Sequence, residues 1–198
     1  MNFGIHKIRD DCNLCKEVNL KIGEKGEYGA VVVCKVGNPG EGWLATLSPK
    51  TGGNVDRDFT IQLMTEKHLT HFSEISDFPE LAKNYGIIFA KISNAITKIM
   101  VEETSDFVIE ENFRERAVSV ATYGKCTNWK DKKEHLHLKI YPFRDEMSQP
   151  SVVDSSFGRK EVFNSSGEEF IKMSPVRKKM LTEERFNYLV KRLMELLE

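Results

Sequence analysis

Two histidines and a lysine in the segment 135–141 are the residues of this chain best placed to do chemistry. His135, His137 and Lys139 alternate with aliphatic residues. Because successive side chains of a β-strand point to opposite faces, a strand here would carry two imidazoles and an ammonium on one face and an apolar row on the other. A neutral imidazole can attack phosphorus, and an ammonium can neutralise charge that develops on phosphate oxygens. The pattern therefore favours phosphate chemistry over two unrelated surface histidines.

A second candidate is the cysteine pair Cys12 and Cys15, which has the CxxC spacing of half a zinc site. A structural zinc site has four ligands, so two more must come from elsewhere in the chain. The alternatives for such a pair are a redox dithiol or simply two half-buried cysteines, and no βαβ pattern of the kind that surrounds redox motifs is present here. The candidates for the two remaining ligands are His68, His71, His135 and His137.

Strands are needed to position these residues, and the sequence predicts five. Three strand-like segments lie between residues 28 and 64, separated by turns rich in Gly, Pro and Asn. Such spacing predicts an antiparallel meander. Two further segments, 116–123 and 135–142, are predicted to pair as a hairpin with a long loop. The polar stretch 143–175 is assigned to loops.

Two helices are predicted, one in the middle of the chain and one at its end. Apolar residues recur every three or four positions over residues 78–100, and Asp77 and Pro79 are signals for the start of a helix. The last helix is expected to begin at Glu183, with Thr182 as its N-cap. A long helix between groups of strands indicates an α+β fold with a mainly antiparallel sheet.

The composition is that of an ordinary globular protein. The chain has 198 residues, 40% of them hydrophobic and 30% charged, with a formal net charge of -1. Domains that bind long nucleic acids normally carry a basic excess, so we expect no such partner. No apolar run approaches the ~18–20 residues of a membrane span, and residues 1–11 lack the apolar core of a signal peptide. We therefore expect no membrane partner and a cytoplasmic location.

The segment HLHLKIYP at residues 135–142 resembles the HxHxH motif of the histidine triad superfamily. The early CxxC pair, the strand meander, the Lys67-His68 pair and the long helix before the histidine strand are also similar to one branch of it. That zinc-containing branch includes galactose-1-phosphate uridylyltransferase and dinucleoside polyphosphate hydrolases. The resemblance implies a histidine triad-like domain over residues 1–145, with residues 146–198 as a C-terminal extension that packs on the same domain.

Roles for individual residues follow from this resemblance. The second motif histidine, His137, would attack the α-phosphorus of a nucleotide and form a nucleotidyl-histidine intermediate. The third motif position, His or Gln in the family, is Lys139 here, which can still offer charge to a phosphate oxygen. His71 is the rival of His68 for one ligand position of a structural zinc site. The zinc ligands implied by the resemblance are Cys12, Cys15, His68 and His135.

The segment 46–54 supplies hydroxyl, ammonium and amide groups that suit the phosphate or ribose of a nucleotide. The resemblance implies a homodimeric nucleotide hydrolase or nucleotidyltransferase whose substrate is a dinucleoside polyphosphate or a nucleotide sugar. A zinc-stabilised nucleotide-binding protein without turnover is the alternative. The candidate substrate-binding residues are Ser48, Lys50 and Asn54, together with Arg144 and Gln149 just past the histidine strand.

Overall fold

The computed structural model describes residues 12–52, 54–103, 118–123, 135–142, 157–163, 166–167, 169–175 and 179–198. These residues form a mixture of helices and antiparallel strands, which confirms the predicted α+β class. The elements in chain order are α1 (Asn13–Glu17), β1 (Val31–Val36), β2 (Trp43–Leu47), β3 (Lys50–Thr51), β4 (Ile61–Thr65), the 3₁₀ helix η1 (Phe72–Asp77), α2 (Pro79–Glu102), β5 (Val118–Tyr123), β6 (His137–Pro142), β7 (Phe157–Phe163), β8 (Glu169–Pro175), β9 (Lys179–Met180) and α3 (Glu183–Leu197).

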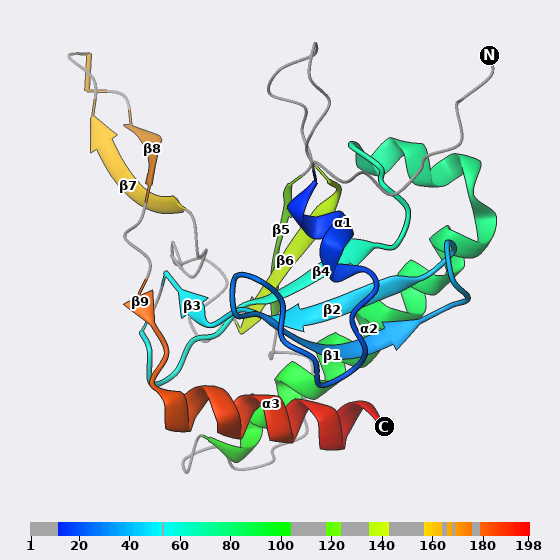
Figure 1. The fold of residues 1–198 in the computed structure, drawn as a ribbon. Coiled ribbons are helices and arrows are strands. Elements are labelled where there is room, and N and C mark those ends of the chain that lie inside the picture. The colour runs from blue at the N-terminus through cyan, green and yellow to red at the C-terminus, as the bar shows by residue number, and fades with distance from the viewer. Residues whose placement is uncertain are drawn as a thin grey trace, which may run out of the picture.

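An antiparallel sheet of five strands, in the order β1-β2-β4-β6-β5, forms the centre of the fold (Figure 1). The first three strands are the predicted meander. The predicted hairpin of β5 and β6 is also present, and β6 is the strand that joins it to β4. In this register Gln62 lies opposite Lys139, and Met64 lies opposite His137.

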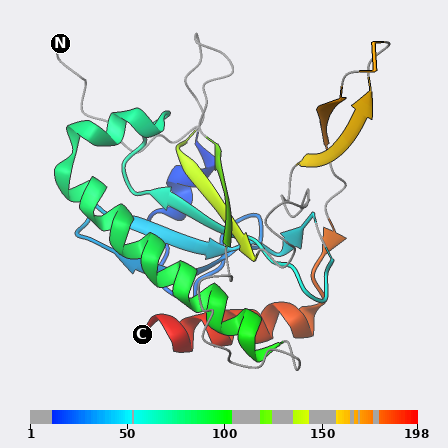
Figure 2. The same cartoon turned by 180° about the vertical axis from the view of Figure 1, so that it is seen from behind.

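One face of the sheet is covered by α2, and α3 packs against both α2 and β1 (Figure 2). Ile88 and Ile92 of α2 and Leu193 of α3 are fully buried in one core with the sheet residue Leu63. Burying an aliphatic side chain of this size contributes roughly 1.5–3 kcal/mol, so this layer supplies much of the stability of the fold.

The two long helices begin for different reasons. Pro79 is the first residue of α2, where its missing N–H needs no partner. The sequence suggested Asp77 as a start signal, but Asp77 ends η1 and Phe78 occupies the cap position of α2 without a capping side chain. At α3 the expected N-cap is confirmed, since the Thr182 hydroxyl accepts a hydrogen bond from the Arg185 N–H at 3.2 Å.

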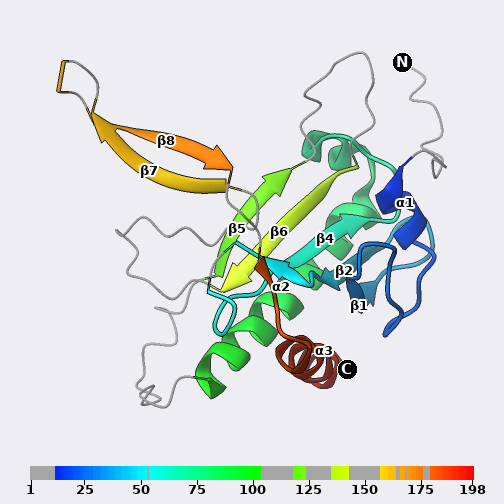
Figure 3. The ribbon, with the colours of Figure 1, turned by 60° about the vertical axis from the view of Figure 1, so that its left-hand side comes forward.

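The other face of the sheet carries the short helix α1 (Figures 1 and 3). Val18, just after α1, packs in a small buried cluster with Val32, Leu44 and Met64. Because Met64 lies opposite His137, the β6 residues His137 and Lys139 also face this side. The sheet thus presents the predicted polar face of β6 toward α1 and its apolar face toward α2.

Two small sheets complete the described part of the chain. β3 pairs with β9, and β7 pairs with β8. The assignment of 143–175 to loops was wrong for β7 and β8. These strands form a sheet of only two strands, so their sequences do not need the long apolar pattern by which strands of a central sheet are recognised.

Candidate functional site

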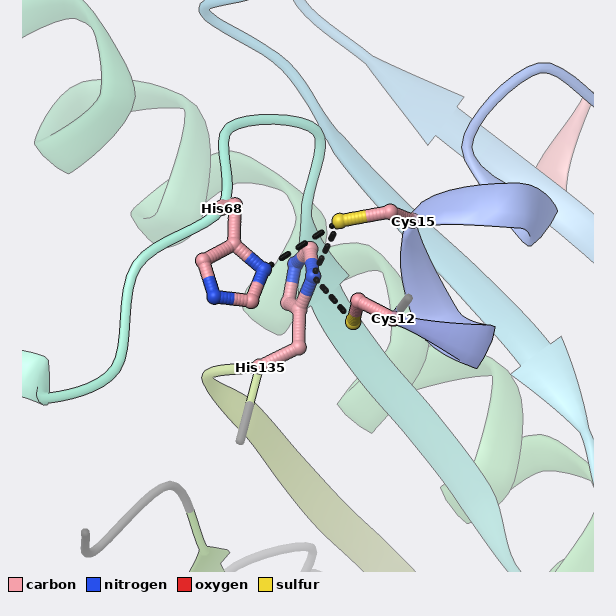
Figure 4. Close-up of side chains that lie close together, drawn as sticks. All are labelled: Cys12, Cys15, His68 and His135. Atoms are coloured by element: carbon pink, nitrogen blue, oxygen red, sulfur yellow. Dashed lines mark hydrogen bonds between the residues drawn. The ribbon is translucent and has the colours of Figure 1, made fainter. Parts of the chain in front are cut away.

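Four buried side chains meet where α1, the end of β4 and the start of β6 come together (Figure 4). Cys12 caps α1 and Cys15 lies within it, while His68 follows β4 and His135 precedes β6. Their ligand atoms all lie within 4.8 Å of one another. The structure therefore brings together the four residues expected to bind zinc.

Local structure explains how residues so distant in sequence meet. On a helix, positions three apart share one side, so Cys12 and Cys15 both direct their sulfurs toward the histidines. The two histidine segments are joined by a backbone hydrogen bond, because the Leu136 N–H donates to the Leu69 carbonyl at 2.6 Å. This bond places His68 and His135 side by side, with ring centroids 5.1 Å apart and the rings nearly perpendicular.

The distances between donor atoms match those of a tetrahedral metal site. The Cys15 sulfur lies 3.2 Å from His68 Nδ1 and 3.4 Å from His135 Nδ1, and the Cys12 sulfur lies 3.8 Å from His135 Nδ1. Metal–sulfur and metal–nitrogen bonds of about 2.3 and 2.0 Å at tetrahedral angles would separate sulfur from nitrogen by about 3.5 Å. The cluster could therefore bind a metal ion, and its four protein ligands would fill a tetrahedral site.

The protonation of His135 also suits a ligand. Its Nε2 lies 2.7 Å from the Thr65 carbonyl oxygen, which can only accept a hydrogen bond, so Nε2 carries the proton. Nδ1 then directs its lone pair at both sulfurs. The ring of His68 has less support, since its buried Nε2 has no hydrogen-bond partner within the described residues. A metal ion on Nδ1 would thus supply the main polar anchor of His68.

The pKa of Cys12 also suits a metal ligand. Burial raises the pKa of the Cys12 thiol, but its hydrogen-bond contacts with His135, His68 and Cys15 outweigh this effect and lower the pKa to about 5. The lowered pKa favours the thiolate, which is the form that coordinates metals. Neither Cys12 nor Cys15 forms a disulfide in the structure.

The rival ligand His71 has a different function. It caps η1: its Nδ1 accepts a hydrogen bond from the Ser73 N–H at 3.2 Å, and the Glu74 carboxylate accepts one from the His71 N–H at 2.7 Å. His71 is also exposed. Of the two histidines that the sequence left open, the structure places only His68 in the cluster.

The expected nucleophile, His137, is held in a defined tautomer. Its Nδ1 lies 2.8 Å from the His135 carbonyl oxygen, so Nδ1 must donate and Nε2 is the unprotonated nitrogen. Lys139 lies on the same face of β6 and is only 8% exposed. His135 thus contributes to both groups of residues, because its imidazole belongs to the Cys12, Cys15, His68 and His135 cluster and its carbonyl accepts a hydrogen bond from His137.

A cavity of about 280 Å³ lies on the same face of the sheet. It contains two of the expected substrate-binding residues, Ser48 and Lys50, and it reaches Gln62, the neighbour of Lys139 across the sheet. The Ser48 hydroxyl donates to the Lys50 carbonyl at 2.9 Å and accepts from the Lys50 N–H at 3.1 Å, which fixes this turn. The cavity is lined by Leu14, Glu17, Tyr28, Ala30, Thr46, Ser48, Pro49, Lys50 and Gln62.

Sequence reasoning missed two polar residues of this cavity, Glu17 and Gln62. Burial raises the pKa of the Glu17 carboxyl, and the negative charge of Glu27 raises it further. No motif marks either residue, because each enters the cavity through packing between elements that are distant in sequence. The spacing of Glu17, two positions after Cys15, could not reveal which way its side chain points.

The remaining expected substrate-binding residues do not join the cavity. The Asn54 side chain accepts a hydrogen bond from the Asp56 N–H at 2.9 Å and so closes its own turn. It is exposed and does not line the cavity. Arg144 and Gln149 lie outside the described residues.

Comparisons of the chain with protein-family models, with curated proteins and with solved structures found no match. Membership of the histidine triad superfamily therefore stays a prediction. None of the helices among the described residues is long and apolar enough to cross a membrane.

Proposed function

We propose that this protein is a nucleotide hydrolase or nucleotidyltransferase of histidine triad type that reacts at the α-phosphorus of a small nucleotide. The observation that carries the proposal is the hydrogen bond from His137 Nδ1 to the His135 carbonyl. With Nδ1 as the donor, Nε2 is the ring nitrogen that would attack phosphorus, as a nucleophilic imidazole requires. The substrate class is a dinucleoside polyphosphate or a nucleotide sugar.

The reaction would take place in two displacements. In the first, His137 Nε2 forms a bond to phosphorus while the bond from phosphorus to the leaving oxygen breaks, which gives a nucleotidyl-histidine. In the second, water, phosphate or a sugar phosphate attacks phosphorus and releases the imidazole. The Lys139 ammonium would neutralise charge on the non-bridging oxygens in both steps. Two inversions give overall retention at phosphorus.

The metal in the Cys12, Cys15, His68 and His135 cluster is proposed to be zinc, because two thiolates and two imidazoles are typical ligands of structural zinc. With all four positions filled by protein, the ion would stabilise structure without binding the substrate. It would join α1 to the start of β6 and so hold the His135 carbonyl that orients His137.

The cavity is proposed to bind the nucleotide. Lys50 lines it, and Lys139 lies opposite its wall residue Gln62 on the neighbouring strand. A phosphate would be stabilised there. We further propose a homodimer and a division into residues 1–145 and 146–198, as in the resemblance.

The test is a turnover assay with dinucleoside polyphosphates and nucleotide sugars, each with and without inorganic phosphate or a sugar phosphate. We expect one substrate to be consumed and His137→Ala to lower kcat/KM by at least about 1,000-fold. His71→Ala, which changes an exposed histidine, is the matched control and should keep the rate. Acid-quenched protein analysed by mass spectrometry should carry a nucleotidyl group in the wild type only. A His137→Ala protein with an unchanged rate would refute the proposal.

A zinc-stabilised nucleotide-binding protein without turnover is the second candidate. Lys139 favours it, since a protonated lysine has no lone pair with which to accept a proton or hydrogen bond. This candidate predicts that nucleotides raise the melting temperature, while product chromatography finds no consumption after long incubation. Consumption that depends on His137 would exclude it.

A further inference from the structure

The cavity contains a carboxylate that the proposed chemistry does not use. Glu17 is only 4% exposed and lines the cavity, yet its side chain forms no hydrogen bond within the described part of the chain. The Glu17 oxygens are not among the fully buried polar atoms that lack a partner in the described residues, so they reach the cavity, where solvent or a ligand can donate to them. A mostly buried carboxylate with no donor from the protein is placed to accept hydrogen bonds from a bound ligand.

Glycine at position 26 makes room for this carboxylate. A Cβ atom at Gly26 would lie 2.6 Å from Glu17 Oε1 and 3.0 Å from Glu17 Cδ. The backbone of Gly26 thus closes over the carboxylate on one side. Two further polar residues, Thr46 and Gln62, line the same cavity. Glu17 is enclosed by protein on one side and opens to the cavity on the other.

The chemistry of Glu17 limits what it can bind. A carboxylate repels phosphate, so the phosphate must lie toward Lys50 and not toward Glu17. A metal ion is disfavoured, because among the described residues no group of three or more potential ligands includes Glu17. Two carboxylate oxygens are well suited to a pair of adjacent hydrogen-bond donors.

We infer that Glu17 is a recognition residue that accepts two adjacent hydrogen bonds from the nucleoside part of the ligand. The inference rests on the proposed function, since a nucleotide has both the phosphate and the paired donors. Such donors occur in two places on a nucleotide: the 2′,3′-diol of ribose, and the N1–H and N2–H edge of guanine. Tyr28, 59% exposed at the cavity, has its hydroxyl held by Asn13 Nδ2 at 2.7 Å and offers a ring beside the same ligand.

Equilibrium binding to the metal-loaded protein tests the inference without any turnover. The ligands are AMP, GMP and 2′,3′-dideoxy-AMP, measured by calorimetry. Glu17→Gln keeps the size of the side chain but replaces one acceptor with a donor. It should raise the Kd for AMP or GMP roughly 10- to 100-fold. Glu27→Gln is the matched control, since Glu27 is an exposed neighbour, and its nucleotide Kd should stay within about twofold of the wild-type value.

The ligand series identifies the donors. If Glu17 binds the diol, wild type discriminates against dideoxy-AMP and the Gln variant does not. If it binds guanine, wild type prefers GMP to AMP and the Gln variant loses that preference. Gly26→Ala is a second variant that tests the function of Glu17, because the added Cβ would displace the Glu17 carboxylate without removing it. A residue with a merely structural function would leave these selectivity ratios unchanged.

Failure of this inference differs from failure of the proposed function. Equal affinity and equal selectivity in wild type and Glu17→Gln would overturn the inference, while turnover that depends on His137 would still stand. Loss of binding in Glu17→Gln together with full activity in His137→Ala would support the inference and refute the proposed mechanism. Wild type that binds none of the three ligands at millimolar concentration would refute both.

Discussion

His68 and His71 offer a direct test of the metal cluster, because the two histidines are three residues apart and the structure gives them different functions. His68 is buried, with Nδ1 3.2 Å from the Cys15 sulfur. His71 is exposed and caps η1. We predict that His68→Ala abolishes stoichiometric metal, whereas His71→Ala retains it.

The magnitudes follow from what each side chain contributes. Loss of a helix cap costs about 1 kcal/mol. In a chain of this size about 1 kcal/mol corresponds to roughly 2–4 °C, which is the fall in melting temperature expected for His71→Ala. Free metal at about 1,000 times its Kd contributes about 4.1 kcal/mol. Loss of the metal through His68→Ala should therefore lower the melting temperature by roughly 8–16 °C.

The assay combines metal analysis of purified protein with thermal unfolding, with and without a strong chelator. Chelator should lower the melting temperature of wild type and of His71→Ala by the same amount, and should leave His68→Ala unchanged. A His68→Ala protein that keeps one equivalent of metal would refute the assignment of the site. So would a His71→Ala protein that loses it.

Three further predictions concern the buried core, the contact between helices α2 and α3, and Lys139 on the face of the sheet that carries His137. Leu193→Ala should cost about 2–5 kcal/mol in chemical denaturation, because Leu193 is fully buried, while the exposed control Lys191→Ala should change little; equal effects would contradict the packing. Hydrogen bonds from Arg192 hold the pKa of Glu102 below its ordinary value. The pair therefore stabilises the fold fully when the pH is above the ordinary pKa of a glutamate, and this stabilisation is lost as the pH falls through the lowered pKa. The melting temperatures of wild type and Arg192→Ala should thus differ at neutral pH and converge in acid, and a gap that widens in acid would contradict this. Lys139→Met should lower kcat more than it raises KM, because its charge is needed as charge builds on the phosphate; an unchanged kcat would exclude that function.

The metal cluster also has a consequence for folding. Cys15 and His135 are 120 residues apart, and their contact closes a long loop of the chain. Loop closure carries an entropic cost that rises only slowly with loop length, so an ion bound by these distant segments would stabilise the fold at a modest entropic cost. Because His135 lies two residues before His137, the same ion would fix the start of the strand that carries the proposed nucleophile.

The sequence predicted the elements of this fold well because their signals are local. The apolar period of α2, the meander of β1, β2 and β4, and the Thr182 cap of α3 each depend on residues close together in the chain. The alternation along β6 likewise indicated that His137 and Lys139 share a face. The CxxC pair limited the metal ligands to a few histidines, since a tetrahedral site needs four donors.

Three features were decided only by the tertiary structure, because each depends on contacts between distant segments. The pairing of β6 with β4 sets Lys139 opposite Gln62. The choice of His68 over His71 follows from the bend of the chain after β4, where His71 turns away to cap η1. The burial of Glu17 in the cavity follows from the packing of α1 on the sheet. Local periodicity determines which side of an element a residue occupies, but only packing determines what lies opposite it.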